Sequence, residues 1–188
     1  MGGWDAHNVT EDADLGVRLA RFGYTTELVN SVTFEEANFR IWPWVKQRSR
    51  WLKGYALTYL VHMRRPSNLV GDLGWWGFLG FQVIFLGTLS TFFLAPVLWT
   101  FWPAIFGLWH PFQDAMQSTT ATKVACGFFA SEFIAIGVAL LAVSATGKRK
   151  LMWWVPTLVA YFPLATLAAL KGLAELWDRP FFWDKTRK

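Results

Sequence analysis

Two short groups of residues in this sequence have side chains that are suited to chemistry. In the first group Gln47, Arg50 and Trp51 are spaced i, i+3 and i+4, so on a helix they share one face. A guanidinium fork binds phosphate oxygens in pairs, and an indole packs on flat partners such as the apolar face of a sugar ring. With the amide to hydrogen-bond a hydroxyl, this face is suited to a diphosphate leaving group and a carbohydrate acceptor.

The second group is Thr10-Glu11-Asp12, which lies in a polar stretch near the amino terminus. The Asp12 carboxylate can act as a general base on an acceptor hydroxyl within its reach. Two plainer interpretations stay open. The acidic residues here can simply complement the dipole of a helix start, and the pair Arg50 and Trp51 can simply anchor a helix at a membrane surface.

Local sequence signals predict the elements that must position these groups. Residues 8–23 are predicted to form a helix that ends before Gly23. Residues 24–34 are rich in Thr, Val and aromatic residues, which predicts one or two short strands. A second helix is predicted from about residue 44 to residue 65, and its mixture of basic and aromatic residues is typical of a membrane surface.

The remaining sequence has the composition of a membrane protein. Hydrophobic residues make up 54% and charged residues 16%, whereas soluble domains have about 25% charged residues. We predict an interfacial helix over residues 69–82 and three membrane spans, over residues 83–106, 124–146 and 151–170. Lys and Arg beside apolar runs, with a modest net charge of +5, favour membrane lipid or an anionic substrate and argue against nucleic acid.

Glu132 is the one acidic residue inside a predicted span. An ionisable side chain at that depth is costly and is a candidate for function, here as a residue facing a polymer channel. The alternative is a protonated Glu132 that is hydrogen-bonded to a polar neighbour such as Gln82 or Thr91. The His residues and the single Cys show no spacing that predicts a metal site.

The order of these motifs resembles that of family 2 glycosyltransferases of the cellulose synthase and hyaluronan synthase type. Thr10-Glu11-Asp12 is similar to their TED motif, and Gln47-Arg48-Ser49-Arg50-Trp51 is similar to their Q-x-x-R-W motif. The resemblance implies a mainly α-helical membrane protein. Residues 1–66 would be the cytoplasmic C-terminal remnant of a GT-A α/β domain, and residues 67–188 would form the interfacial and transmembrane helices.

The resemblance also implies a role for each matching residue. Asp12 would be the base that deprotonates the acceptor, and Arg50 with Gln47 would hold the nucleotide diphosphate. Trp51 would line the acceptor site. Thr10 and Glu11 would support the loop that carries the TED motif. The implied reaction is an inverting transfer of sugar from a nucleotide-sugar donor to a growing polysaccharide or glycan, which leaves through a channel between the spans.

The sequence contains no counterpart of the family's nucleotide-binding half or of its D-x-D metal motif. We therefore expect a truncated gene product, a fragment or one half of a split enzyme, with the missing N-terminal half as a separate chain in the last case. Alone it would bind no cofactor, whereas the full-length enzyme would use Mg or Mn with the nucleotide sugar. The expected location is the bacterial inner (plasma) membrane.

Two other classes of protein remain as alternatives. One is a non-catalytic membrane interaction subunit that pairs with a separate nucleotide-binding chain. The other is a small transporter-like protein whose motif matches are accidental, but this class leaves the polar residues 1–68 unexplained.

Overall fold

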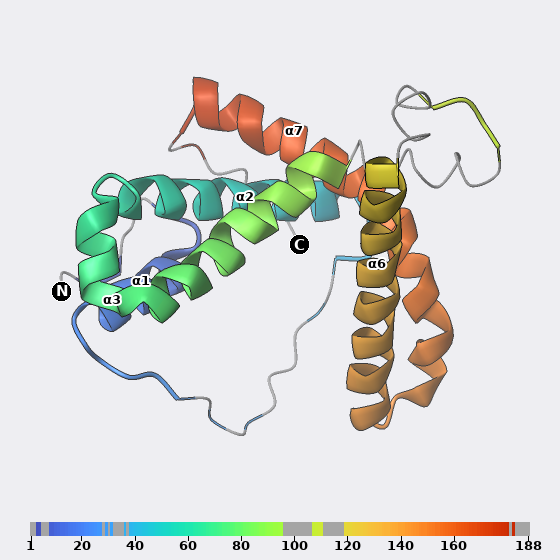
Figure 1. The fold of residues 1–188 in the computed structure, drawn as a ribbon, viewed down its shortest axis with the longest axis horizontal. Coiled ribbons are helices and arrows are strands. Elements are labelled where there is room, and N and C mark those ends of the chain that lie inside the picture. Colours follow the sequence, from blue (N-terminus) through green and yellow to red (C-terminus); the bar gives the residue numbers. More distant parts are fainter. Residues whose placement is uncertain are drawn as a thin grey trace. The chain divides into compact units, whose positions relative to one another are not determined.

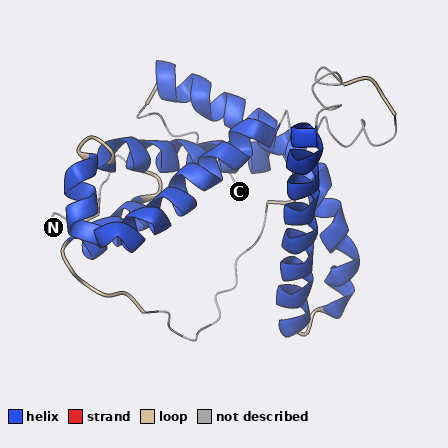
Figure 2. Ribbon diagram, viewed as in Figure 1, coloured by secondary structure: helices blue, strands red, loops and turns tan. Residues whose placement is uncertain are grey.

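The computed structural model describes most of the chain, and the described part is helical. The described residues are 3–4, 8–27, 29, 31, 36, 38–95, 107–110, 119–180 and 182. In chain order the elements are α1 (Glu11–Arg21), α2 (Ile41–His62), α3 (Pro66–Phe81), the π-helical segment η1 (Gln82–Gly87), α6 (Thr119–Ala145), the 3₁₀ helix η2 (Arg149–Tyr161) and α7 (Phe162–Asp178). They are drawn in Figure 1, and Figure 2 shows helices and loops but no strand among the described residues.

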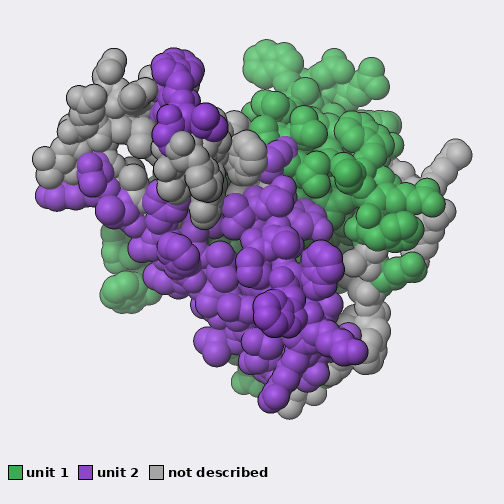
Figure 3. Space-filling model, turned by 90° about the vertical axis from the view of Figure 1, so that its right-hand side faces the viewer, with its two compact units in different colours: residues 1–94, 164–188 green, residues 95–163 purple. Residues whose placement is uncertain are grey.

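The chain forms two compact units, which Figure 3 colours separately. The first unit comprises residues 1–94 and 164–188, and the second comprises residues 95–163. The motifs that suggested chemistry, residues 10–12 and 47–51, both lie in the first unit. The sequence-based division of the chain at residue 66 into a cytoplasmic and a membrane part stays a prediction.

Helix α1 begins and ends where its sequence signals indicate. Acidic side chains fill its first turn, where the helix dipole favours them. Its end is closed by Gly23, which has a φ of 78°, and by the hydrogen bond from the Tyr24 N–H to the Leu19 carbonyl. A Gly in the left-handed region followed by such a bond is a common helix stop. The predicted strands are absent from the described residues of the segment 24–34, and its other residues lie outside the described part.

Helix α2 is the central element of the first unit rather than a helix that only lies on a membrane. Val45, Leu52 and Ala56 are buried, and they form one hydrophobic cluster with Leu89 and with small residues of α7. A Cβ added to Gly172 of α7 would lie 3.2 Å from the Ser49 carbonyl oxygen of α2. Small residues on α7 therefore let the two helix backbones approach closely.

The segment predicted as a third span, residues 151–170, is divided between two helices, which have the length and apolar composition of a span only when they are taken together, so this span stays a prediction. The segment is not one helix, because the 3₁₀ helix η2 ends at Tyr161 and the α-helix α7 begins at Phe162. Ala168 and Ala169 of α7 are almost fully buried within the first unit. The small residues of α7 also pack this helix against α2.

Helix α3 contains a sharp break at Gly74, where φ is 67° and ψ is 172°. This conformation is accessible to glycine and strained for other residues. The chain turns there and continues as a helix from Trp75 through η1 to Ala95. The predicted division after residue 82 is therefore wrong, since the helix is continuous there, and residues 96–106 of the predicted span lie outside the described part.

Within the described residues, one helix is long and apolar enough to cross a membrane, namely Pro66–Ala95. Its straight part after Gly74 has a length of about 30 Å at 1.5 Å per residue, which equals the thickness of about 30 Å of a hydrocarbon core. Val83 and Ile84 point away from the protein, with exposed fractions of 73% and 56%. The opposite face contributes Phe81 and Phe85 to a second hydrophobic cluster with α1 and α2.

In the second unit α6 packs against η2. The two helices are joined by a short turn in which Gly147 has a φ of 73°. The helix predicted over residues 124–146 is confirmed as α6, and its role as a membrane span stays a prediction. Pro156 lies inside η2, where it cannot donate a backbone hydrogen bond.

Candidate functional site

The TED segment is packed directly on α2. A Cβ added to Gly54 would lie 2.6 Å from Oγ1 and 2.8 Å from Cγ2 of Thr10, so the absence of a side chain at position 54 makes room for Thr10. Thr10 is buried, and it precedes the first residue of α1. The start of α1 is thereby fixed at the level of Gly54.

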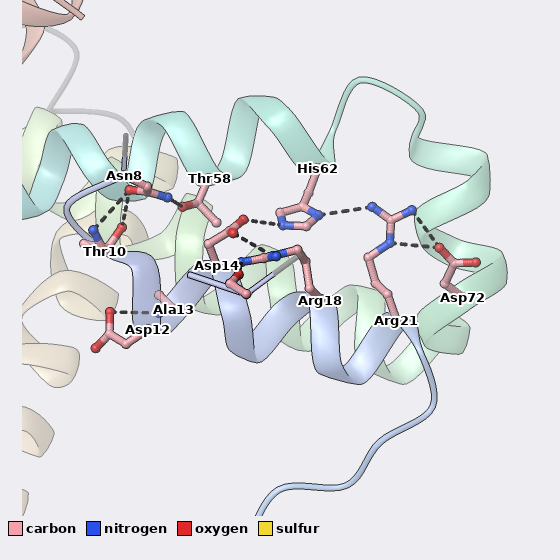
Figure 4. A network of polar contacts seen from close by, with 11 residues as sticks. Asn8, Thr10, Asp12, Ala13, Asp14, Arg18, Arg21, Thr58, His62 and Asp72 are labelled. Carbon is pink, nitrogen blue, oxygen red and sulfur yellow. Dashed lines mark hydrogen bonds and ion pairs between the residues drawn. The ribbon is translucent and has the colours of Figure 1, made fainter. Parts of the chain in front are cut away.

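A second contact fixes the chain just before Thr10. The Asn8 amide donates to Oγ1 of Thr58 at 2.8 Å, and its Oδ1 accepts the backbone N–H of Thr10 at 3.1 Å. Gly54 and Thr58 are four residues apart, so they lie on one face of α2. Figure 4 shows Asn8 and Thr10 beside Thr58 on this face, and Asp12 on the first turn of α1 that follows.

Asp12 is the candidate base, and its side chain is exposed to solvent. Its Oδ1 accepts the backbone N–H of Ala13 at 2.8 Å, which fixes one carboxylate oxygen. Within the described part of the chain, Oδ2 has no hydrogen-bond partner and is available to a hydroxyl of a substrate. Glu11 is half-buried at the start of the same turn.

Arg50 lies one helical turn before Gly54, on the α2 face against which Thr10 packs. Its Nε atom is shielded from solvent. Helices α1 and α2 run in the same direction, because Thr10 contacts Gly54 and Asp14, further along α1, contacts His62, further along α2. The amino-terminal end of α1 is therefore directed toward the turn of α2 that carries Arg50.

The other residues of the Q-x-x-R-W motif have well-defined neighbours. Oε1 of Gln47 accepts a hydrogen bond of 2.9 Å from the Asn38 amide. The Arg48 guanidinium lies over the ring of Trp51 at 4.5 Å and over the ring of Trp44 at 5.4 Å. Burial lowers the pKa of Arg48 from its ordinary value.

This stacking was not predicted from the sequence, which placed Arg50 and Trp51 on one face of the helix and assigned no role to Arg48. Arg48 and Trp51 are three residues apart on α2, and Arg48 and Trp44 are four apart, so the spacing was a usable signal. The Trp51 side chain keeps an exposed fraction of 40%, which leaves part of the indole accessible to a sugar.

Glu132 lies in α6, in the second unit, and its role in a channel stays a prediction. The two neighbours proposed for it from the sequence are engaged inside the first unit. Oε1 of Gln82 accepts the Tyr59 hydroxyl at 3.0 Å, and the Thr91 hydroxyl donates to the Gly87 carbonyl at 2.9 Å.

The structure also contains a polar network that sequence reasoning missed (Figure 4). Nε2 of His62 lies 3.0 Å from Oδ1 of Asp14, and Arg21 lies 3.1 Å from the other ring nitrogen. Arg21 also forms an ion pair of 2.7 Å with Asp72 of α3. The sequence suggested that Asp14 simply charges a helix start, but its carboxylate is buried between α1 and α2.

A second missed residue is Lys53, whose side chain is only 1% exposed. Its ammonium group donates to the backbone carbonyls of Arg179 and Phe182, just after α7. Desolvation by burial lowers the pKa of Lys53, and Glu175 opposes this shift. In the sequence Lys53 is one of several basic residues on a helix predicted to lie at a membrane surface. Its hydrogen-bond partners could not be predicted, because they are more than a hundred positions away.

A divalent metal, which the family resemblance implies, has no ligand set among the described residues. No group of three or more His, Cys, Asp or Glu side chains that could hold an ion occurs in that part of the chain. His7, which lies near the TED motif in the sequence, is outside the described residues.

Comparison with known families identifies the class of protein to which this site belongs. The family described as "Glycosyl transferase family group 2" matches residues 1–173. Because the match extends over most of the chain, the chain belongs to this glycosyltransferase family. This confirms the membership inferred from the TED and Q-x-x-R-W motifs. No curated protein and no solved structure matches the chain.

Proposed function

We propose that this chain supplies the acceptor side of an inverting, membrane-embedded glycosyltransferase that extends a polysaccharide or glycan. The packing of Thr10 on Gly54 carries the proposal. Gly54 lies one helical turn after Arg50 on the same face of α2, so this contact holds the TED motif beside the turn that carries Arg50. The base and the diphosphate-binding group required for glycosyl transfer then lie on adjoining elements.

In the proposed step Asp12 accepts the proton of an acceptor hydroxyl as that oxygen attacks the anomeric carbon of the donor. A glycosidic C–O bond forms, and the bond from the anomeric carbon to the diphosphate oxygen breaks. The nucleoside diphosphate leaves with the electron pair, and Arg50, aided by Gln47, binds its phosphate oxygens. Direct displacement from the opposite face inverts the anomeric configuration.

Trp51 serves as the acceptor platform in this proposal, since part of its indole is exposed and Arg48 holds the ring. A flat aromatic surface stacks on a sugar ring without requiring a particular pattern of hydroxyl groups. The nucleotide and the metal would be bound by a nucleotide-binding half that is not among the described residues.

The helix over residues 75–95 supports an integral membrane location, with residues 1–66 on the cytoplasmic side. Its length fits a bilayer, and much of its apolar surface faces away from the first unit. Arg64 and Arg65 lie just before α3, which agrees with the excess of basic residues on cytoplasmic sides of membranes.

The role of Asp12 can be tested by replacing it with asparagine. Membranes that contain the enzyme and its nucleotide-binding half would be supplied with a panel of UDP- and GDP-linked sugars, and product formation would be measured. We expect Asp12→Asn to lower kcat by about 10²–10⁴-fold, the usual contribution of a general base. The KM of the donor should change little, because Arg50 is untouched.

A matched control is Asp178→Asn, which removes an exposed carboxylate at the end of α7. This variant should transfer sugar at the parent rate. If Asp12→Asn is as active as this control, Asp12 is not the base. If the parent forms no glycoside with any donor while a separate subunit does, the chain is a non-catalytic partner.

A further inference from the structure

His62 is a buried imidazole that the proposed chemistry does not use directly. It lies at the end of α2, with an exposed fraction of 4%, and each of its ring nitrogens has a charged partner. Nε2 is 3.0 Å from Oδ1 of Asp14, and Nδ1 is 3.1 Å from Nη1 of Arg21. The edge of the ring also contacts Phe81, with centroids 6.1 Å apart.

These two partners determine the tautomer of His62. An ionised carboxylate only accepts hydrogen bonds, and a guanidinium only donates them. Nε2 must therefore carry the hydrogen that is donated to Asp14, and Nδ1 must accept the N–H of Arg21. Both contacts are made only by the neutral imidazole with its proton on Nε2.

The same network joins α1 to its neighbours at several points (Figure 4). The second carboxylate oxygen of Asp14 pairs with Arg18 at 2.8 Å, and Arg18 also donates to the Gly3 carbonyl at 2.7 Å. Arg21 pairs with Asp72, in the part of α3 that precedes the break. His62 thus lies between the first turn of α1, which bears Asp14, and the last turn, which bears Arg21.

We propose that neutral His62 is a positioning residue for glycosyl transfer, which holds α1 in register on α2 through Asp14 and so fixes the position of Asp12 relative to the turn of α2 that carries Arg50. This inference rests on the proposed function. Asp14 is two residues after Asp12 in the first helical turn, so a shift of Asp14 moves the base with it. A misplacement of about 1 Å at a reacting group costs about 10²-fold in rate.

Protonation of His62 would disrupt the network. The added hydrogen on Nδ1 would point at the guanidinium of Arg21, which has no acceptor to offer. The charged groups facing the ring are Asp14, Arg18 and Arg21 of α1, and Asp72 of α3 lies behind Arg21. Burial lowers the pKa of His62, although its bond to Asp14 opposes this shift, so the neutral form prevails at about pH 7.

Two substitutions separate positioning from mere support of the fold. His62→Gln retains an amide N–H that can reach Asp14 but does not titrate, whereas His62→Leu fills the space without any polar contact. We expect His62→Leu to lower kcat by about 10²-fold with an unchanged donor KM, and His62→Gln to recover most of that loss. In the parent kcat should fall as the pH decreases below about 6.5, and His62→Gln should lack this fall.

Hydrogen exchange provides a readout that does not depend on activity. In the parent enzyme the backbone N–H of Asp14, which donates to the Thr10 carbonyl at 3.1 Å, should be protected. His62→Leu should speed its exchange, and His62→Gln should not. If His62→Leu keeps the parent kcat, or if His62→Gln keeps the same loss of rate at acid pH, the inference is overturned. A parent without transferase activity would contradict the proposed function, while unchanged exchange in His62→Leu would contradict the positioning by His62.

Discussion

Thr10 occupies the space that a side chain of Gly54 would take, with its Oγ1 only 2.6 Å from where a Cβ would lie. This contact joins the TED segment, which contains the candidate base, to the helix that carries Arg50 and Trp51. Two motifs that are about 40 residues apart in the sequence are thereby brought onto adjoining surfaces. The fit is specific to these two positions, because only glycine leaves room for Thr10.

The first prediction concerns this contact. Gly54→Ala should force Thr10 away from α2 and lower the free energy of unfolding by about 1–3 kcal/mol, as overpacking generally does. It should also lower kcat more than this loss of stability explains, because the base moves. Thermal unfolding in detergent and transfer rates in membranes would measure both effects.

Gly16→Ala is the matched control, since a Cβ at this position of α1 meets no atom within 4 Å. It should be neutral, or stabilising by up to about 1 kcal/mol through helix propensity. If Gly54→Ala and Gly16→Ala had the same free energy of unfolding and the same kcat, the position of the TED segment would not depend on the contact between Thr10 and Gly54.

The second prediction is a pH dependence of stability that arises from His62. Burial holds the pKa of His62 in the folded protein below its ordinary value of 6.5, so the unfolded chain binds the proton more readily. The free energy of unfolding should therefore rise as the pH increases through the window between the lowered pKa and 6.5, and level off above it.

Comparison with His62→Gln isolates this contribution, because the carboxylates titrate in both proteins. Urea unfolding of the parent and the variant, at pH values from about 5 to about 8, should give a difference that changes with pH only below about 6.5. A constant difference over the whole range would mean that the folded state does not depress the pKa of His62.

The third prediction concerns the ring of Trp51. Arg48→Met replaces the arginine by an unbranched apolar side chain and so removes the cation that lies over the indole at 4.5 Å. Loss of such a contact costs about 0.5–2 kcal/mol, so the acceptor KM should rise by about 2–30-fold with little change in donor KM. Arg64→Met, which alters an exposed arginine just after α2, should leave both values unchanged. An unaltered acceptor KM in Arg48→Met would exclude a role for the stack in acceptor binding.

The fourth prediction tests the membrane location of the helix over residues 75–95. Val83 is exposed on this helix, and Val83→Lys would place an ammonium group within the hydrocarbon core at a cost of about 2.5–3.5 kcal/mol. The fraction that resists alkaline extraction from membranes should fall. Val29→Lys changes another exposed valine, which lies outside the helices, and this variant should integrate into membranes as the parent does. Equal integration of the two variants would argue against a bilayer around residue 83.

The sequence was sufficient to predict elements that are specified by local signals. Helix α1 follows from its acidic first turn and from Gly23, and α2 and α6 follow from their composition. The break at Gly74 was not predictable in the same way. The chain contains many glycines, and only the backbone conformation shows that this one turns the helix.

Packing and membrane insertion produce the same sequence pattern in α7. Ala165, Ala168 and Ala169 lie within the span predicted over residues 151–170, and together with Gly172 they have the spacing of three and four residues that is also the signature of a close helix contact. The partners of His62 were also hidden, because Asp14 precedes it by 48 residues. The Q-x-x-R-W motif was found because its members are close in sequence, and its residue Arg48 was overlooked because the motif does not require it.

The hydrogen bonds of Lys53 have a consequence for the biosynthesis of the protein. The carbonyls that it binds follow it by 126 and 129 residues, just after α7. A ribosome must therefore translate at least 129 residues beyond Lys53 before this lysine on α2 can obtain both partners. Until then the helix that carries Arg50 and Trp51 contains an ammonium group that is still hydrated. Maturation of the site thus awaits translation of the segment that follows α7.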